Sequence, residues 1–230
     1  MQKTTLLILF LLILSISSAR AEVDNQTGIW PQLMLKIKLN EKSQLNLGSS
    51  PRVNDNYRQF DQHLWISDYI YHFSEHWSGL LGYRWLTTYP DDFGQQHWLD
   101  QGIIFNHKLR VNESKVISFK HRAMIEERFM NNIDVYSTRF RYLLSARMPL
   151  TKSQKLSLLS FNELFINLNE TETGPEQGVD RNRFFFGLDY MFNKNMNLEA
   201  GYQLETVNLL DNRYRLEHLL VTNLVFNISL

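Results

Sequence analysis

Arginine and glutamate recur on one side of several consecutive segments of this chain. Residues two apart in an extended strand point to the same face, so Arg122, Glu126 and Arg128 share a face. Neighbouring strands lie about 4.8 Å apart, which lets guanidinium and carboxylate groups on matching faces form ion pairs. Glu199 and Glu205 could extend such a network. Its predicted members are Arg84, Arg122, Glu126, Arg128, Arg139, Arg141, Glu163, Arg181, Arg183, Arg215 and Glu217.

This polar network has two interpretations. If the strands enclose a narrow lumen, isolated charges there would be costly, so arginine and glutamate would pair, fill the interior and make it rigid. The alternative interpretation is a surface for binding or selectivity. Because the cluster holds more arginines than acids, that surface would favour anions.

Catalytic and metal-binding patterns are weak. A hydrolase would need serine, histidine and a carboxamide or carboxylate in one unit, and no spacing in the chain indicates such a unit. Ser160, Asn162 and His218 form a trio of suitable types that chance easily supplies. His72 and His76 have helical spacing but lie at an expected tight turn. The chain has no cysteine and no glycine-rich phosphate loop, so no catalytic residue, metal or cofactor is assigned.

The elements expected to carry these residues are strands, because apolar and polar residues alternate along most of the chain. The last segment shows the pattern most clearly, since its even-numbered positions from 216 to 230 are mainly apolar. Phe140, Tyr142 and Leu144 likewise oppose Arg139 and Arg141. The sequence therefore predicts an all-β fold made of two-faced strands.

The apolar faces are expected to contact lipid. Many segments run to roughly ten to fifteen residues, which suits a tilted strand that crosses hydrocarbon. A soluble barrel with its apolar face inside would show the same alternation and remains the alternative. Aromatic residues near strand ends are typical of membrane interfaces, and they include Trp77, Trp85, Tyr142, Tyr190 and Tyr202.

Connections between the expected strands alternate between short and longer ones, as in outer-membrane barrels. The most prominent surface loop is expected at 170–180. The alternation gives about eleven strands, but bacterial single-chain barrels have an even number. The prediction is therefore an antiparallel transmembrane barrel of ten to twelve strands, with the first hairpin as the place where the count is uncertain.

The N-terminal segment is typical of a secretion signal. Lys3 precedes a short apolar run, and Ala19 and Ala21 supply the small residues of a cleavage site after Ala21. Removal of this segment would leave 22 basic and 24 acidic side chains, a net charge of −2 that does not suggest nucleic-acid binding. Residues 22–230 are then expected to form a single barrel in the bacterial outer membrane.

Four motifs, in order along the chain, resemble those of a known family. They are His-Arg-x-x-x-Glu-x-Arg-Phe at 121–129, Arg-x-Arg-Tyr at 139–142, Asn-Glu-x-Phe-x-Asn at 162–167 and Arg-Asn-Arg-x-x-x-Gly at 181–187. The family is labelled domain of unknown function 2490. The resemblance spans nearly all of the mature chain and implies a small outer-membrane barrel of Gram-negative bacteria whose activity is uncharacterised.

Two hypotheses for function follow. The first is a non-enzymatic barrel that acts as a narrow channel, a scaffold or a surface-loop binding protein. The second is an outer-membrane enzyme that modifies lipids, as an acyl hydrolase or transferase. The expected partners are outer-membrane lipid and, during biogenesis, the barrel assembly machinery; the final amphipathic strand resembles the signal that this machinery reads. The sequence does not indicate the oligomeric state.

Overall fold

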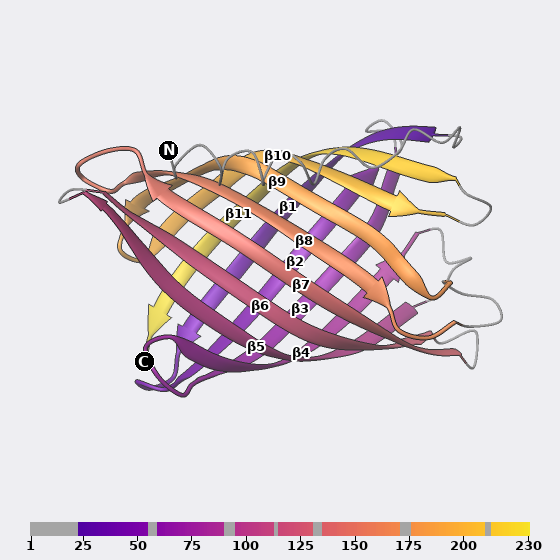
Figure 1. The fold of residues 1–230 in the computed structure, drawn as a ribbon, viewed down its shortest axis with the longest axis horizontal. Helices are drawn as coiled ribbons and strands as arrows, with labels where there is room; N and C mark the ends of the chain where they lie inside the picture. Colours follow the sequence, from indigo (N-terminus) through magenta and orange to yellow (C-terminus); the bar gives the residue numbers. More distant parts are fainter. Residues whose placement is uncertain are drawn as a thin grey trace, which may run out of the picture.

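The strands of this chain close into a barrel in a computed structural model (Figure 1). The structure describes residues 23–54, 59–89, 95–112, 115–130, 135–170, 176–209 and 213–230. The expected signal segment, with Ala19 and Ala21, lies outside the described residues. Within them there is no helix that could cross a membrane. The strands are β1 (Val23–Lys38), β2 (Ser43–Asn54), β3 (Gln59–His72), β4 (Trp77–Thr88), β5 (Gln95–Asn112), β6 (Lys115–Met130), β7 (Val135–Pro149), β8 (Leu156–Asn167), β9 (Gly178–Asn193), β10 (Met196–Asn208) and β11 (Tyr214–Ser229).

Eleven strands form the wall among the described residues, within the predicted range of ten to twelve. Consecutive strands pair antiparallel, and β1 closes the barrel by pairing in parallel with β11, from Val23 opposite Tyr214 to Lys38 opposite Ser229. The expectation of an even number was wrong because it assumed that every pair is antiparallel. β1 and β11 therefore begin at the same rim. The short turn between β1 and β2 fits this eleven-strand arrangement, and no twelfth strand is needed to explain it.

The two rims of the barrel differ in their connections. At the turn-side rim β1, β3, β5, β7 and β9 end, and two to six residues of sequence separate each from the next strand. At the loop-side rim β2, β4, β6, β8 and β10 end, and four to ten residues separate each from the next strand. The connection between β8 and β9 spans the most residues, and β9 begins at Gly178, slightly before the predicted end of the surface loop at 180.

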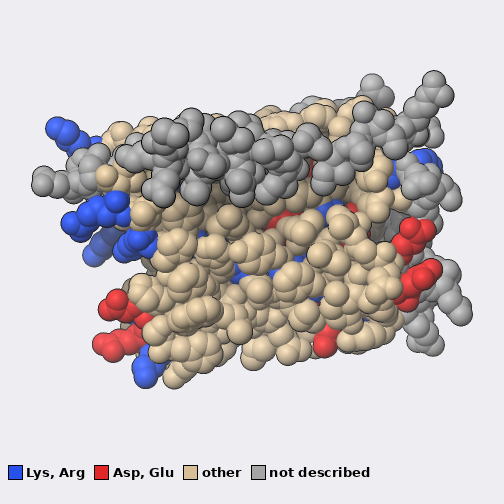
Figure 2. All heavy atoms as spheres, viewed as in Figure 1, with Lys and Arg blue, Asp and Glu red and all other residues tan. Residues whose placement is uncertain are grey.

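Each strand presents one face to the lumen and one to the outside. Luminal positions are even-numbered in β1 to β6 and odd-numbered in β7 to β11, as the buried residues indicate, except that the even-numbered Asp180 is also buried, at a shift in the pairing of β9 with β8. The outward face exposes large apolar side chains such as Leu81, Ile103 and Leu220. On the face drawn in Figure 2, charged residues gather toward the two ends, and most of the described surface between them is uncharged. The predicted apolar faces therefore point outward and the predicted arginine faces point inward.

Two prolines interrupt the pairing of β1 with β2. The ladder holds at Ile29 opposite Val53 and again from Leu33 opposite Ser49, but the three residues of each strand between these pairs are not paired with one another. Pro31 and Pro51 lie in this gap, and proline has no backbone N–H to donate. β1 keeps its continuous pairing with β11 on its other edge.

Candidate functional site: the charged lumen

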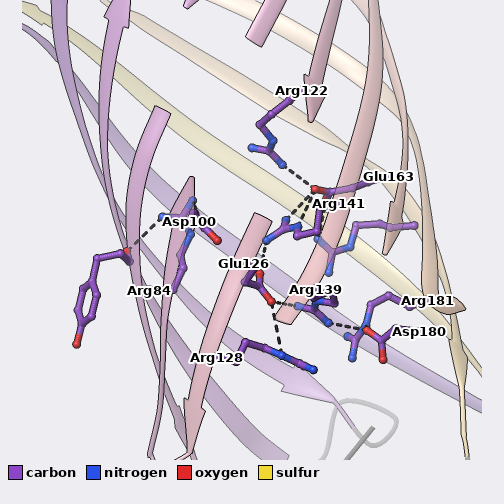
Figure 3. Close-up of polar contacts among 12 residues, drawn as sticks. Arg84, Asp100, Arg122, Glu126, Arg128, Arg139, Arg141, Glu163, Asp180 and Arg181 are labelled. Atoms are coloured by element: carbon purple, nitrogen blue, oxygen red, sulfur yellow. Dashed lines mark hydrogen bonds and ion pairs between the residues drawn. The ribbon is translucent and has the colours of Figure 1, made fainter. Parts of the chain in front are cut away.

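The lumen holds a continuous set of ion pairs between neighbouring strands. Its residues come mainly from β6, β7, β8, β9 and β10, whose luminal faces lie next to one another around the wall. In Figure 3 the side chains of Arg122, Glu163, Arg141, Glu126, Arg139 and Asp180 form a chain of polar contacts across these strands.

Glu126 is the centre of the part near the loop-side rim. Its two oxygens accept hydrogen bonds from Arg139 Nη2 at 2.5 Å and from Arg141 Nη1 at 2.7 Å. Arg128 Nε lies 3.9 Å from Glu126 Oε1, and Glu126 has no exposed surface. Glu126 and Arg139 are directly opposite in the pairing of β6 with β7, so the register of the sheet creates this contact.

Glu163 on β8 plays the same role two strands further on. It accepts a hydrogen bond from Arg122 Nη2 at 2.7 Å and from Arg141 Nη2 at 2.8 Å. Arg183 Nη1 lies 3.5 Å from its other oxygen. Arg141 therefore joins the Glu126 group to the Glu163 group, as the bidentate geometry of a guanidinium permits.

Asp180 and Glu205 complete the network. Asp180 accepts hydrogen bonds from Arg139 Nη1 at 2.5 Å and from Arg181 Nε at 2.9 Å. Glu205 accepts hydrogen bonds from Arg181 Nη1 at 2.8 Å and Arg183 Nε at 2.9 Å. These contacts hold the arginines of β7 and β9 in a fixed arrangement.

An aromatic ring supports the same arginines. Phe165 is 1% exposed, and the guanidinium carbons of Arg139 and Arg141 lie 4.8 and 4.6 Å from the centre of its ring. Arg183 and Arg181 lie 5.1 and 5.9 Å away. The face of an aromatic ring attracts cations, so Phe165 stabilises positive charge without a carboxylate.

Arg84 forms a separate group on the other side of the lumen. Its Nη1 lies 2.5 Å from Asp68 Oδ1 on β3 and its Nη2 lies 3.2 Å from Asp100 Oδ2 on β5. Gly82 is the residue opposite both acids in the sheet. A Cβ atom at Gly82 would lie 2.7 Å from Asp68 Oδ1 and 3.0 Å from Arg84 Nη1, so glycine leaves the space in which Arg84 bridges the two acids.

Arg215 and Glu217 lie near the loop-side rim, away from the main chain of contacts. Arg215 Nε lies 3.3 Å from Asp24 and its Nη1 lies 3.7 Å from Glu217. The structure therefore brings nine of the eleven residues suggested by the sequence into the luminal ion-pair groups, and places Arg215 and Glu217 in a separate, more exposed pair.

A further group near the turn-side rim centres on Arg147. Its Nη1 lies 2.5 Å from Asp189 and its Nη2 lies 2.9 Å from Glu199, which also accepts a hydrogen bond from Asn223. Sequence reasoning singled out Glu199 and Glu205 as extensions but missed Asp68, Asp100, Asp180, Asp189 and Arg147. Four of these residues have the luminal parity of their strands, and that parity was the available signal. Asp180 has the opposite parity and lies at a shift in the pairing of β8 with β9, which alternation along the strand does not reveal.

Two adjoining cavities occupy the lumen. A loop-side cavity of about 500 Å³ is lined by residues that include Trp30, Arg128 and Arg181. A turn-side cavity of about 960 Å³ is lined by residues that include Lys36 and Lys108. They share lining residues that include Asp68, Arg122 and Phe161. Among the described residues, eight arginines line the loop-side cavity, namely Arg52, Arg84, Arg122, Arg128, Arg139, Arg141, Arg181 and Arg183.

Three of the carboxylates lie behind these arginines, whereas Asp68, Glu163 and Glu199 line the loop-side cavity. Glu126, Glu205 and Asp100 are at most 1% exposed and do not line either cavity. The side chains of Arg122 and Arg181, in contrast, are 17% and 28% exposed and line the loop-side cavity. Eight arginines and three acids therefore line the loop-side cavity among the described residues, so its surface is predominantly cationic.

Residues that could have formed a hydrolytic unit are not brought together. Ser160 and Asn162 lie on β8 and His218 on β11, with β9 and β10 between them in the wall. His218 Nδ1 instead lies 2.6 Å from the hydroxyl of Tyr202 on the outward face. In the part of the chain that the structure describes, no group of three or more histidine, aspartate or glutamate residues could hold a metal ion.

The fold and lumen define a closed β-barrel with an interior of ion pairs. The chain belongs to the family described as Protein of unknown function (DUF2490), whose profile matches residues 27–216, and the resemblance seen in the sequence motifs is confirmed. An uncharacterized protein of Methylorubrum extorquens is 30% identical over 116 residues, which are 50% of this chain and 51% of that protein. The chain thus spans about half the length of the curated relative it matches.

Among solved structures, the barrel is similar to one described as the NanC porin in a rhombohedral crystal form. The TM-score is 0.49 at 8% sequence identity, over 80% of this chain and 86% of that chain.

Proposed function

We propose that this chain is an outer-membrane barrel that forms a narrow passage for small anions. An apolar outward face, strands long enough to cross hydrocarbon and rims that differ in connection length support a place in the outer membrane. In this proposal lipid surrounds the wall, and the barrel assembly machinery inserts the chain.

The observation that carries the proposal is the predominance of arginine side chains on the surface of the lumen. Seven of the eight arginines that line the loop-side cavity form ion pairs, with Asp68, Asp100, Glu126, Glu163, Asp180 and Glu205. Arg52 adds a positive charge that no carboxylate within 4.0 Å neutralises among the described residues. Rings of arginine and lysine in a pore favour anions, because a cation there meets like charge as it loses its hydration shell.

The turn-side cavity adds to this bias. Lys36, Lys108 and Lys120 line it and form no ion pair in the part of the chain that the structure describes. The ion-paired side chains fill much of the barrel nearer the loop-side rim, so the passage is narrow and its conductance is expected to be small.

The test is a current measurement across a planar bilayer that contains the purified barrel. A salt gradient is expected to give a small, steady current with a reversal potential that shows anion selectivity. Arg122→Gln and Arg181→Gln are each expected to lower the anion-to-cation permeability ratio several-fold. Lys152→Gln, in the connection between β7 and β8, is the control and is expected to leave the ratio unchanged.

Two outcomes would contradict the passage. A folded barrel that carries no current would indicate a closed scaffold, and a current selective for cations would reverse the role given to the arginines. Lipid A and phospholipids are expected to be the same with and without the protein, as mass spectrometry can measure. A changed acyl pattern would favour an enzyme instead.

A further inference from the structure

The loop-side cavity has two chemically different walls. The arginines of β6, β7 and β9 form one wall. The other holds a luminal cluster of Leu64, Leu86 and Trp98 with Ile66 packed against it, and Trp30 also lines it. These apolar side chains come from β1, β3, β4 and β5, and the cluster adjoins the arginines at β5, where Trp98 lies opposite Arg128 of β6. A passage for inorganic anions needs no such apolar wall.

Arg52 differs from the other arginines of this cavity. Its Nη1 donates a hydrogen bond to Gln62 Oε1 at 3.2 Å, and its guanidinium carbon lies 4.0 Å from the centre of the Trp30 ring. It has no ion pair within 4.0 Å among the described residues. Arg183 lies 5.5 Å from the centre of the same ring, so Trp30 is near both guanidinium groups.

Several buried polar atoms of residues that line this cavity have no hydrogen-bond partner. They are the donors Arg52 Nε, Trp98 Nε1, Arg122 Nε and Arg139 Nε and the acceptor Asn223 Oδ1. Buried polar groups are normally partnered, and because the donors outnumber the acceptor, the wall of this cavity favours a ligand that accepts hydrogen bonds. A carboxylate accepts at two oxygens and donates nothing when it is ionised, which matches this set.

From these observations we propose that the loop-side cavity binds monocarboxylates that carry an apolar body, and that Arg52 determines this specificity. The carboxylate would lie beside Arg52 and the apolar body against Leu64, Leu86 and Trp98. The cavity volume of about 500 Å³ falls in the range of small-molecule sites, which are mostly apolar with a few polar groups that fix orientation. The proposal rests on the anion passage, because it names the class of anion that the passage selects.

The experiment measures binding to the folded full-length barrel in detergent micelles by isothermal titration calorimetry. The probes are benzoate, acetate and benzyl alcohol, each titrated at neutral pH and constant ionic strength. Benzoate is expected to bind at least tenfold more tightly than acetate, which lacks the ring, and than benzyl alcohol, which lacks the charge. Equal affinity of benzoate and acetate would overturn the role of the apolar wall.

Arg52→Gln is expected to weaken benzoate binding about tenfold or more and to leave the binding of benzyl alcohol, which has no carboxylate, little changed. Since Arg52 has no ion pair, this substitution removes no partner from the network. Lys152→Gln, in the exposed connection between β7 and β8, is the control and is expected to bind benzoate as the unchanged protein does. Retention of full benzoate affinity by Arg52→Gln would overturn its role.

Failure of this inference and failure of the anion passage give different results. An anion-selective current without a preference for benzoate would remove the inference and keep the passage. Binding of benzoate by a barrel that carries no current would keep the site and remove the passage.

Discussion

At the residue scale, a few carboxylates form ion pairs with a larger number of arginines. Glu126 contacts Arg128, Arg139 and Arg141, and it lies where no solvent reaches it. A buried ion pair offers little net stability over a pair of apolar residues, but the loss of one partner leaves the other charge buried and unpaired. Glu126 is therefore the residue whose removal the interior tolerates least.

We expect Glu126→Ala to lower the free energy of unfolding by about 3–5 kcal/mol, because three guanidinium groups lose a shared partner. Urea titration of the detergent-solubilised barrel, followed by tryptophan fluorescence, measures this change. Glu199→Ala is the control, since its partner Arg147 is 36% exposed and a partly solvated pair is worth about 1 kcal/mol or less. Equal losses in the two variants would contradict the central role of Glu126.

The sequence was sufficient to place Arg122, Glu126 and Arg128 on one face, because strand parity is local information. It could not supply the pairing of Arg84 with Asp68 and Asp100. Those contacts depend on the register of three strands and on the missing side chain of Gly82. The unpaired state of Arg52 depends on contacts between strands in the same way.

At the scale of the strands, the outward face of the wall indicates which environment surrounds the barrel. Leu81 lies on β4 with 61% of its surface exposed, between luminal Leu80 and Gly82. An exposed leucine in water is common, but a continuous outward face of such residues around a closed barrel suits hydrocarbon. The alternation that predicted these strands is set residue by residue, so their faces could be assigned from the sequence.

Leu81→Arg tests the contact of this face with lipid. We expect the free energy of unfolding in lipid vesicles to fall by about 2–4 kcal/mol, the cost of an arginine on the lipid-facing side near mid-membrane. Leu150→Arg, in the connection between β7 and β8, is expected to change it by about 0.5 kcal/mol or less. If Leu81→Arg were as harmless as Leu150→Arg, the outward face would not lie in hydrocarbon.

At the scale of the whole molecule, the parallel pairing of β1 with β11 places the two ends of the wall at opposite rims. Val23 begins β1 at the loop-side rim, whereas Ser229 ends β11 at the turn-side rim. The sequence could not indicate this closure, because alternation along a strand carries no information about the direction of its neighbour. The even-number rule for bacterial barrels pointed the other way.

Single cysteines can test this arrangement, since the chain has none of its own. We expect a membrane-impermeant maleimide to label Val23→Cys on intact cells, because the longer connections of outer-membrane barrels face outward. Ser153→Cys, in a turn-side connection, is expected to react only after the cells are permeabilised. Labelling of both or neither before permeabilisation would contradict the placement of Val23 and Ser153 on opposite sides.

The gap at Pro31 and Pro51 has a consequence for how the wall comes apart. In a closed barrel each strand normally forms backbone hydrogen bonds with both neighbours, and these bonds keep the wall closed. Between β1 and β2 a short stretch lacks this pairing. We expect amide hydrogens of residues 29, 33, 49 and 53, which flank the gap and point toward the partner strand, to exchange with deuterium faster than those of 35 and 37 in the folded protein, as mass spectrometry can follow. Separation of the strands would then start between β1 and β2. Replacement of Pro31 or Pro51 by a residue with a backbone N–H would slow it.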